Sequence, residues 1–175
     1  MTAATFDVDL TTLTTEKAKV EVCNDRDNLV TNGFRPTISF AYPYAAYNTS
    51  AQQMVRDCGY TSGRAAGGFP SGVYAETIPP QDHYAVRTPV TDRSLAQLQA
   101  AVTNAENNGG GWVPIVFHEV CNCSDASLSV TLKTFTAFLD WLQPRSANGT
   151  VVRTVGDVIS SAAPAELAPT TTASW

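Results

Sequence analysis

Trp112-Val113-Pro114-Ile115-Val116-Phe117-His118 is the most hydrophobic run in this chain, and it ends on one of only two histidines. Three glycines precede it, and a loop rich in Cys, Asn, Ser and Asp follows it at residues 121–125. A short apolar run with turn residues at both ends predicts a buried strand. Strands buried on both faces are typical of parallel sheets that helices cover. His118 therefore occupies the strand end where α/β folds place their chemistry.

Helices and strands are predicted to alternate along the rest of the chain. The expected helices cover about 14–32, 50–58, 94–108, 131–142 and 156–161, and the expected strands cover 37–42, 60–63, 84–88, 112–118 and 150–155. Leu95, Leu98 and Val102 illustrate the helical spacing of apolar residues. Thr14 is a typical N-cap, and Gly33 suits the left-handed position after a helix. This alternation predicts parallel βαβ units in an open sheet or part of a barrel.

Length and composition indicate one domain with a sizeable core. The chain has 175 residues, 43% of them hydrophobic, and we expect the domain to occupy residues 1–161. The tail at 162–175 is rich in Ala, Pro and Thr and is predicted to be disordered. The net charge of −5 and the lack of a basic cluster argue against nucleic acid as a partner. No apolar run is long enough to cross a membrane, and residues 1–7 lack a signal-peptide pattern.

Four cysteines are an even number, and with the richness in Thr, Ser and Asn they suit an exported protein; buried free thiols are the alternative. Cys121-x-Cys123 has no second Cys/His pair at zinc-like spacing.

Three groups of residues are candidates for function. His118 suits a general acid or base, and the alternative is a structural histidine at a strand end. Phe40-Ala41-Tyr42-Pro43-Tyr44 places a proline between two tyrosines, which fixes a bend that can aim a backbone N–H and an aromatic ring into a cleft. An ordinary packed aromatic turn is the alternative for this segment. Asp7 and Asp9 alternate on one segment and suit a cation, although solvated surface acids are commoner.

Together these segments resemble a known family. Ser39–Tyr44, Val55–Tyr60, Val113–His118 and the closing stretch Phe135–Ile159 are similar to the C-terminal part of polysaccharide deacetylases, the NodB-homology domains of carbohydrate esterase family four. The resemblance covers roughly residues 8–161 and implies an incomplete distorted (β/α) barrel. It also implies a secreted or cell-surface hydrolase that removes acetyl groups from chitin-, peptidoglycan- or xylan-type polysaccharide with a divalent metal such as zinc.

The resemblance assigns roles to several residues. His118 would be the acid that protonates the leaving amine, and Val116 would line the pocket for the acetyl methyl group. Tyr44 would give its backbone N–H to the oxyanion. The same layout places Cys23 on the first helix and Cys58 at the end of the second, where adjacent helices on one sheet face bring them within disulfide reach. Cys121 and Cys123 are too close in sequence for an easy bridge with each other.

The metal motifs of the family are not matched. Its metal is held by an aspartate and two histidines, but the aligned histidine positions fall on Ala3 and Asp7, and neither is a histidine. Thr5-Phe6-Asp7 is similar in letters to the family's Thr-Phe-Asp-Asp motif, which makes Asp7 the one candidate ligand. We therefore expect a truncated domain that binds no metal and has little or no deacetylase activity, because a deacetylase without its metal has no activated water.

The alternative is a non-catalytic carbohydrate-binding remnant whose cleft uses Tyr42, Tyr44 and Trp112. A third possibility is a chain that folds poorly, because a barrel without its first strands exposes a sheet edge.

Overall fold

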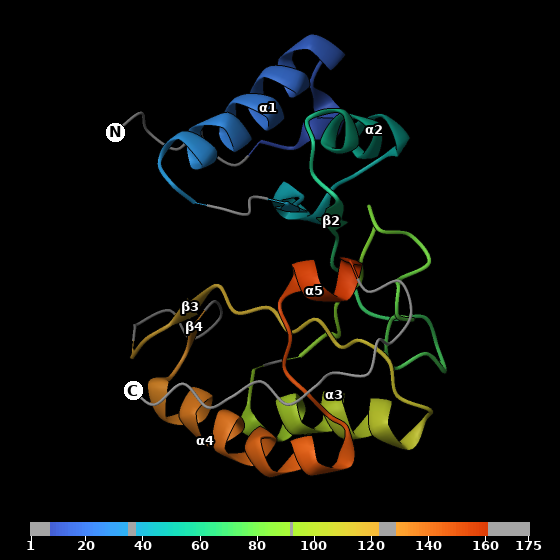
Figure 1. Ribbon diagram of the computed structural model, residues 1–175, viewed down its shortest axis with the longest axis vertical. Helices are drawn as coiled ribbons and strands as arrows, with labels where there is room; N and C mark the ends of the chain where they lie inside the picture. Colours follow the sequence, from blue (N-terminus) through green and yellow to red (C-terminus); the bar gives the residue numbers. More distant parts are fainter. Residues whose placement is uncertain (1–7, 35–37, 92, 123–128, 161–175) are drawn as a thin grey trace.

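The computed structural model describes residues 8–34, 38–91, 93–122 and 129–160. Within these ranges, helices and short strands alternate (Figure 1). The helices are α1 (Thr15–Thr31), α2 (Thr49–Asp57), α3 (Leu95–Asn107), α4 (Leu132–Leu142) and α5 (Val155–Ser160), with 3-10 turns at Leu10–Thr12, Pro43–Ala45 and Gln143–Asn148. The strands are β1 (Ser39–Ala41), β2 (Ser62–Arg64), β3 (Glu119–Val120) and β4 (Ser129–Val130). All five predicted helices are therefore present, each within one residue or so of its expected bounds.

Local capping explains why the helix ends could be predicted. The side chain of Thr14 accepts a hydrogen bond from the Lys17 N–H, and Asn48 caps α2 in the same way at the Ala51 N–H, 2.9 Å away. Such caps satisfy backbone donors that have no partner within the helix. Gly33 follows α1 with a φ of 88°, the left-handed conformation expected after a helix.

The strands pair in parallel, as the alternation predicted. β1 and β2 pair through Ser39 with Ser62, Phe40 with Gly63 and Ala41 with Arg64, and α2 forms the connection between them. Val86 continues this order through a parallel bridge to Arg64. β3 and β4 form a second parallel pair. The described residues thus form a mixed α/β fold with short parallel strands between helices, as expected, and among them the strands make two separate sheets in which no barrel is detected.

Three predicted strands are not found as strands. In the segment 84–88 only Val86 forms a ladder contact, the bridge to Arg64. In the run 112–118 only Trp112 forms a ladder contact, an antiparallel bridge to Glu76, and β3 starts after His118. Pro114 has no N–H to give a ladder, and Ile115 and Phe117 pack against the helical cluster of α3 and α4. The segment 150–155 is not a strand either, because Val151 and Val152 are exposed and α5 begins at Val155.

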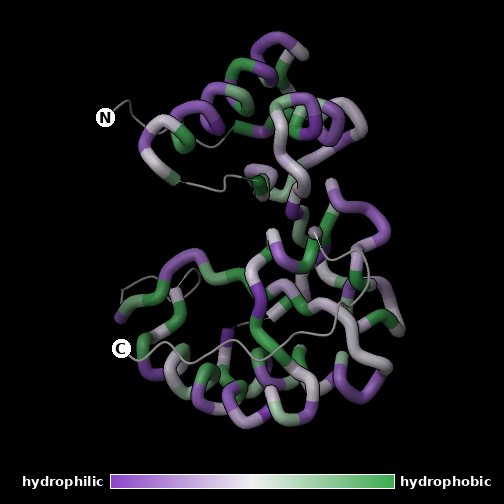
Figure 2. Tube along the Cα trace, in the orientation of Figure 1, coloured by the Kyte–Doolittle hydropathy of each residue, from purple (hydrophilic) through white to green (hydrophobic). Residues whose placement is uncertain are grey.

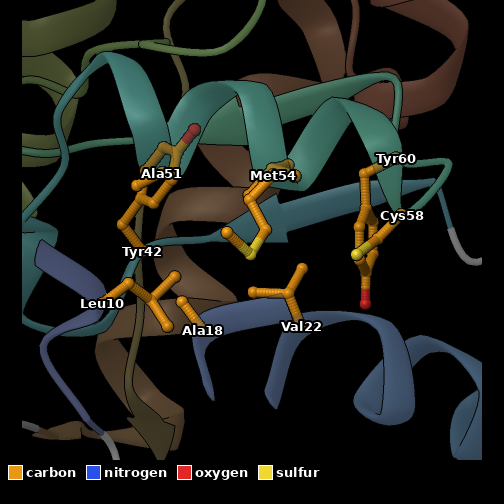
Figure 3. Packing of buried hydrophobic residues seen from close by; sticks show 9 residues of the cluster. Leu10, Ala18, Val22, Tyr42, Ala51, Met54, Cys58 and Tyr60 are labelled. Atoms are coloured by element: carbon orange, nitrogen blue, oxygen red, sulfur yellow. The ribbon is translucent and has the colours of Figure 1, made fainter. Parts of the chain in front are cut away.

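Two hydrophobic clusters hold the fold. The first lies between α1 and α2, which Figure 1 shows at one end of the molecule, and Figure 3 shows Leu10, Ala18 and Val22 facing Met54 of α2. Its buried members are Leu10, Ala18, Val22, Tyr42, Ala51, Met54, Val55, Cys58 and Tyr60. The second lies between α3 and α4 at the other end and contains Leu98, Val102 and Phe138. Most of α1 is hydrophilic (Figure 2), and the helix buries only Ala18 and Val22.

A disulfide cross-links α1 to the end of α2 beside the first cluster. Cys23 of α1 and Cys58 at the end of α2 are bonded, with their α-carbons 4.9 Å apart, so the pairing expected from the layout is present. Cys121 is disulfide-bonded as well. The expectation that Cys121 and Cys123 would not easily bridge each other involves Cys123, which lies outside the described residues. None of the helices in the described ranges has the length and hydropathy needed to cross a membrane.

Candidate functional site

The carboxyl ends of the parallel strands identify one edge of the first sheet as the place for a site. β1, β2 and Val86 run in the same direction, so the segments that follow them leave at the same edge. In open α/β sheets, ligands bind in the crevice outside the carboxyl ends of the strands. The segments that leave this edge are 42–46 after β1, 65–74 after β2 and 87–90 after Val86.

Tyr42 anchors the turn after β1. Its side chain is only 2% exposed, its hydroxyl donates a hydrogen bond to the carbonyl oxygen of Tyr84 at 2.9 Å, and its ring stacks on Tyr47. Burial raises the pKa of the Tyr42 hydroxyl, and the nearby charge of Asp82 raises it further. The ring is covered by the protein, so the predicted sugar-stacking role does not fit Tyr42. Its role is to hold the turn in place.

Tyr44 is presented at the surface by an unusual backbone. It is 76% exposed, and both Tyr44 and Ala45 are left-handed, with φ of 55° and 57°. This conformation costs about 1–2 kcal/mol for each residue that is not glycine. The turn is closed by hydrogen bonds from the Ala45 N–H to Tyr42 and from the Ala46 N–H to Pro43. The bend predicted from Pro43 is therefore present, and such strain is typical of functional sites.

A pocket of about 280 Å³ lies at the same edge of the sheet. It is formed by the loop after β2, the segment after Val86 and one face of α3, and its lining is Gly67, Gly68, Phe69, Val73, Tyr74, Pro89, Val90, Gln97, Ala100, Ala101 and Asn104. None of these residues is an acid, a lysine, an arginine or a histidine. The pocket is therefore suited to an uncharged ligand.

The residues around His118 belong to the second cluster instead. His118 is exposed and lies directly before β3, and the Phe117 ring meets the Phe135 ring edge-on at 5.2 Å. Val116 is half-buried between Ile115 and Phe117 in the sequence, and both of these pack on the α3–α4 cluster. Trp112 is half-buried and exchanges two backbone hydrogen bonds of 2.8 Å with Glu76. The pocket lining includes none of the predicted site residues.

The side chains in the described ranges do not fit the three-ligand metal set of the resemblance. His83 lies beside β2, where its carbonyl oxygen accepts a hydrogen bond from the Gly63 N–H, whereas His118 precedes β3. Asp7 lies outside the described residues. Within residues 8–34, 38–91, 93–122 and 129–160, no three His, Cys, Asp or Glu side chains form a group that could hold a metal ion.

The pocket residues were not predicted as a site from the sequence. The Gly- and Ala-rich segment after β2 was the available signal, together with the polar positions of α3. Gln97 and Asn104 are seven residues apart and so share one face of the helix, away from the buried Leu98 and Val102. Nothing local in the sequence indicates that this face of α3 and the loop after β2 line the same pocket.

Comparisons with protein-family models, curated proteins and solved structures gave no match for this chain. The functional assignment therefore rests on the residues and their geometry.

Proposed function

We propose that this chain is a polysaccharide deacetylase-like domain that recognises acetylated polysaccharide or oligosaccharide. The observation that carries this proposal is the exposed, left-handed Tyr44 at the carboxyl end of a parallel strand. In the motif that the sequence resembles, this tyrosine ends the strand and offers its backbone N–H to the substrate. The parallel β1-α2-β2 unit supports the same assignment, because it places the turn at the edge of the sheet where ligands bind.

His118 is the proposed general acid, and Val116 is proposed to contact the acetyl methyl group. The imidazole is exposed and so is accessible to a polymeric substrate. The amide nitrogen leaves poorly as an anion, and its protonation lets it leave as a neutral amine; an imidazolium is suited to give that proton near neutral pH. In the family a bound divalent metal supplies the activated water.

We propose that the chain by itself releases little or no acetate. It carries two histidines, His83 and His118, 35 positions apart in the printed sequence, so it contains no His-x-x-x-His motif. The test is acetate release from acetylated chitooligosaccharide with added zinc or cobalt, for the wild type and for His118→Ala and His83→Ala. Absence of turnover above background is the expected result. Robust turnover that is lost in His118→Ala and kept in His83→Ala would contradict the weak activity while supporting the role of His118.

A non-catalytic carbohydrate-binding domain is the second candidate. The uncharged pocket with aromatic residues in its lining favours it, because sugars bind through aromatic faces and hydrogen bonds without any metal. A glycan pull-down with and without a chelator separates the two candidates. Binding that the chelator abolishes favours the metal-dependent enzyme, and binding that persists favours the carbohydrate-binding domain.

The disulfide between Cys23 and Cys58 supports a secreted or cell-surface location, because structural disulfides persist in oxidising compartments.

A further inference from the structure

We infer that the pocket between the 67–74 loop and α3 is a binding site for an uncharged sugar residue of a glycan chain. The ligand class rests on the proposed function, but the site is distinct from Tyr44 and His118, which do not line it. The pocket has no charged side chain in its lining, and it combines aromatic rings, two amides and a helical wall that is held in the second cluster.

The lack of charge in the lining selects the class of ligand. Moving an ionic group out of water is costly unless an opposite charge or several hydrogen bonds compensate for it. The lining of this pocket offers no charged side chain to a phosphate, a carboxylate or an ammonium group. A neutral ligand rich in hydroxyl or amide groups avoids that cost.

Aromatic and aliphatic side chains form the apolar part of the pocket. Tyr74 is 39% exposed, and Val73 and Val90 are 44% and 77% exposed. The Phe69 side chain is half-buried beside them. An accessible tyrosine ring gives a large rigid contact face and a hydroxyl at its edge. A sugar ring has the matching properties, since its C–H face is apolar and its rim carries hydroxyl groups.

Two amides on α3 provide the hydrogen-bonding part. Gln97 and Asn104 lie two turns apart on the helix, about 10 Å along its axis, and both side chains are exposed. Each amide can donate and accept, which suits hydroxyl groups and the carbonyl or N–H of an acetamido group. Ala100 and Ala101 lie between them and leave space for the ligand.

The α3 wall of the pocket is held by buried contacts. The opposite face of α3 is fixed in the second cluster by Leu98, which is 0% exposed, and by Val102. On the loop side, Gly68 lies beside the exposed Val90 side chain, from which a methyl group on Gly68 would be 3.0 Å away. A volume of about 280 Å³ is just below the range for small-molecule sites, about 300–1,000 Å³, and fits a single unit of a chain.

The test is a titration of the full chain with chitohexaose, and separately with cellohexaose, followed by the backbone amide signals in a ¹⁵N–¹H spectrum. Shifts at Gly67, Gly68, Ala100 and Asn104 are expected with at least one of the two glycans. Tyr74→Ala and Asn104→Ala are each expected to weaken binding by about tenfold, the effect of losing one good contact. Asn107→Ala is the matched control, because Asn107 is an exposed asparagine of the same helix outside the pocket lining. Tyr74→Trp keeps an aromatic face and should retain binding.

The outcomes separate this inference from the proposed function. Glycan binding that is unchanged in Tyr74→Ala, Asn104→Ala and Gln97→Ala overturns the pocket and leaves the proposed function standing. Failure of both glycans to shift any amide signal overturns both. Since all three substituted side chains lie at the surface, the dispersed spectrum of each variant also shows directly that it is folded.

Discussion

The aromatic ring of Tyr42 lies directly over the α-carbon of Gly63. A methyl group on Gly63 would sit 2.6 Å from the Tyr42 hydroxyl oxygen and 2.8 Å from its ring carbon Cε2, closer than real side chains approach. The Tyr42 hydroxyl reaches past β2 to the carbonyl oxygen of Tyr84. This relationship places the turn that carries Tyr44, because Tyr42 and Tyr44 are separated only by Pro43.

Gly63→Ala should therefore destabilise the domain. The added methyl group forces the buried Tyr42 ring to move, and overpacking of this kind costs about 1–3 kcal/mol in the free energy of unfolding. Chemical denaturation measures the change. Tyr42→Phe should not restore the loss, because ring carbons also lie within 3 Å of the added methyl position. An unfolding free energy equal to that of the wild type would contradict the contact.

Ser62→Ala should be neutral or stabilising. Ser62 is 2% exposed, and its hydroxyl oxygen has no hydrogen-bond partner among the residues that the structure describes. A buried hydroxyl without a partner costs about 1–3 kcal/mol, and alanine removes that cost with a small loss of packing. This variant is also the neighbouring control for Gly63→Ala. A loss of more than about 1 kcal/mol would indicate that Ser62 makes a hydrogen bond in solution.

Removal of the disulfide should cost considerable stability. Cys23 and Cys58 close a loop with a sequence separation of 35, for which the chain-entropy relation gives about 3–4 kcal/mol. The Cys23→Ala, Cys58→Ala double variant should unfold at correspondingly lower denaturant concentration. Reductant should lower the stability of the wild type toward that of the variant. Equal midpoints for the oxidised wild type and the variant would show that the bridge contributes nothing.

Glu106 should make the stability of the α3–α4 half depend on acid pH. Hydrogen bonds from Arg145 and then from Thr150 lower the pKa of Glu106 to about 2, and the Arg145 guanidinium lies 4.0 Å from the centre of the Trp141 ring. A carboxyl group whose pKa is lowered in the folded state stabilises the fold above its ordinary pKa, and this contribution is lost as the pH falls toward 2.

Glu106→Gln tests this dependence. The wild type should be more stable than the variant at neutral pH, and the difference should shrink continuously as the pH falls below about 4.5. Urea denaturation over this pH range measures it, and added salt should reduce the difference because the pair is partly exposed. A difference that stays constant with pH would show that the Glu106 charge has no role.

The helices could be predicted from the sequence because their signals are local. Thr14 caps the start of α1 by bonding to a residue three positions away, and Gly33 takes the left-handed conformation two residues after the helix ends. The bend at Pro43 was predictable for the same reason. The strands were predictable only in part, because a ladder depends on a neighbour far away in the sequence: the strands expected at 37–42 and 60–63 are present as β1 and β2, and those expected at 84–88, 112–118 and 150–155 are not. The run 112–118 has the composition of a strand, yet Pro114 and the packing of Ile115 and Phe117 leave it without one.

The site was only partly predictable for a related reason. Tyr42 and Tyr44 look alike in the sequence, but Gly63 makes space to bury one ring while the left-handed turn exposes the other. The pocket is assembled from segments around Gly67, Val90 and Asn104, and no single segment carries a motif. Its lack of charge becomes visible only once these segments are brought together.

Recognition of acetylated polysaccharide by this chain can be measured by its retention on insoluble chitin compared with cellulose. Both polymers are neutral and insoluble, and they differ in the acetamido group that the proposed function requires. We expect the wild-type chain to be retained on chitin in preference to cellulose, and Tyr44→Ala to be retained less because it removes the exposed ring that is available to the polymer. Equal retention on the two polymers, or none on chitin, would show that the chain does not recognise acetylated polysaccharide.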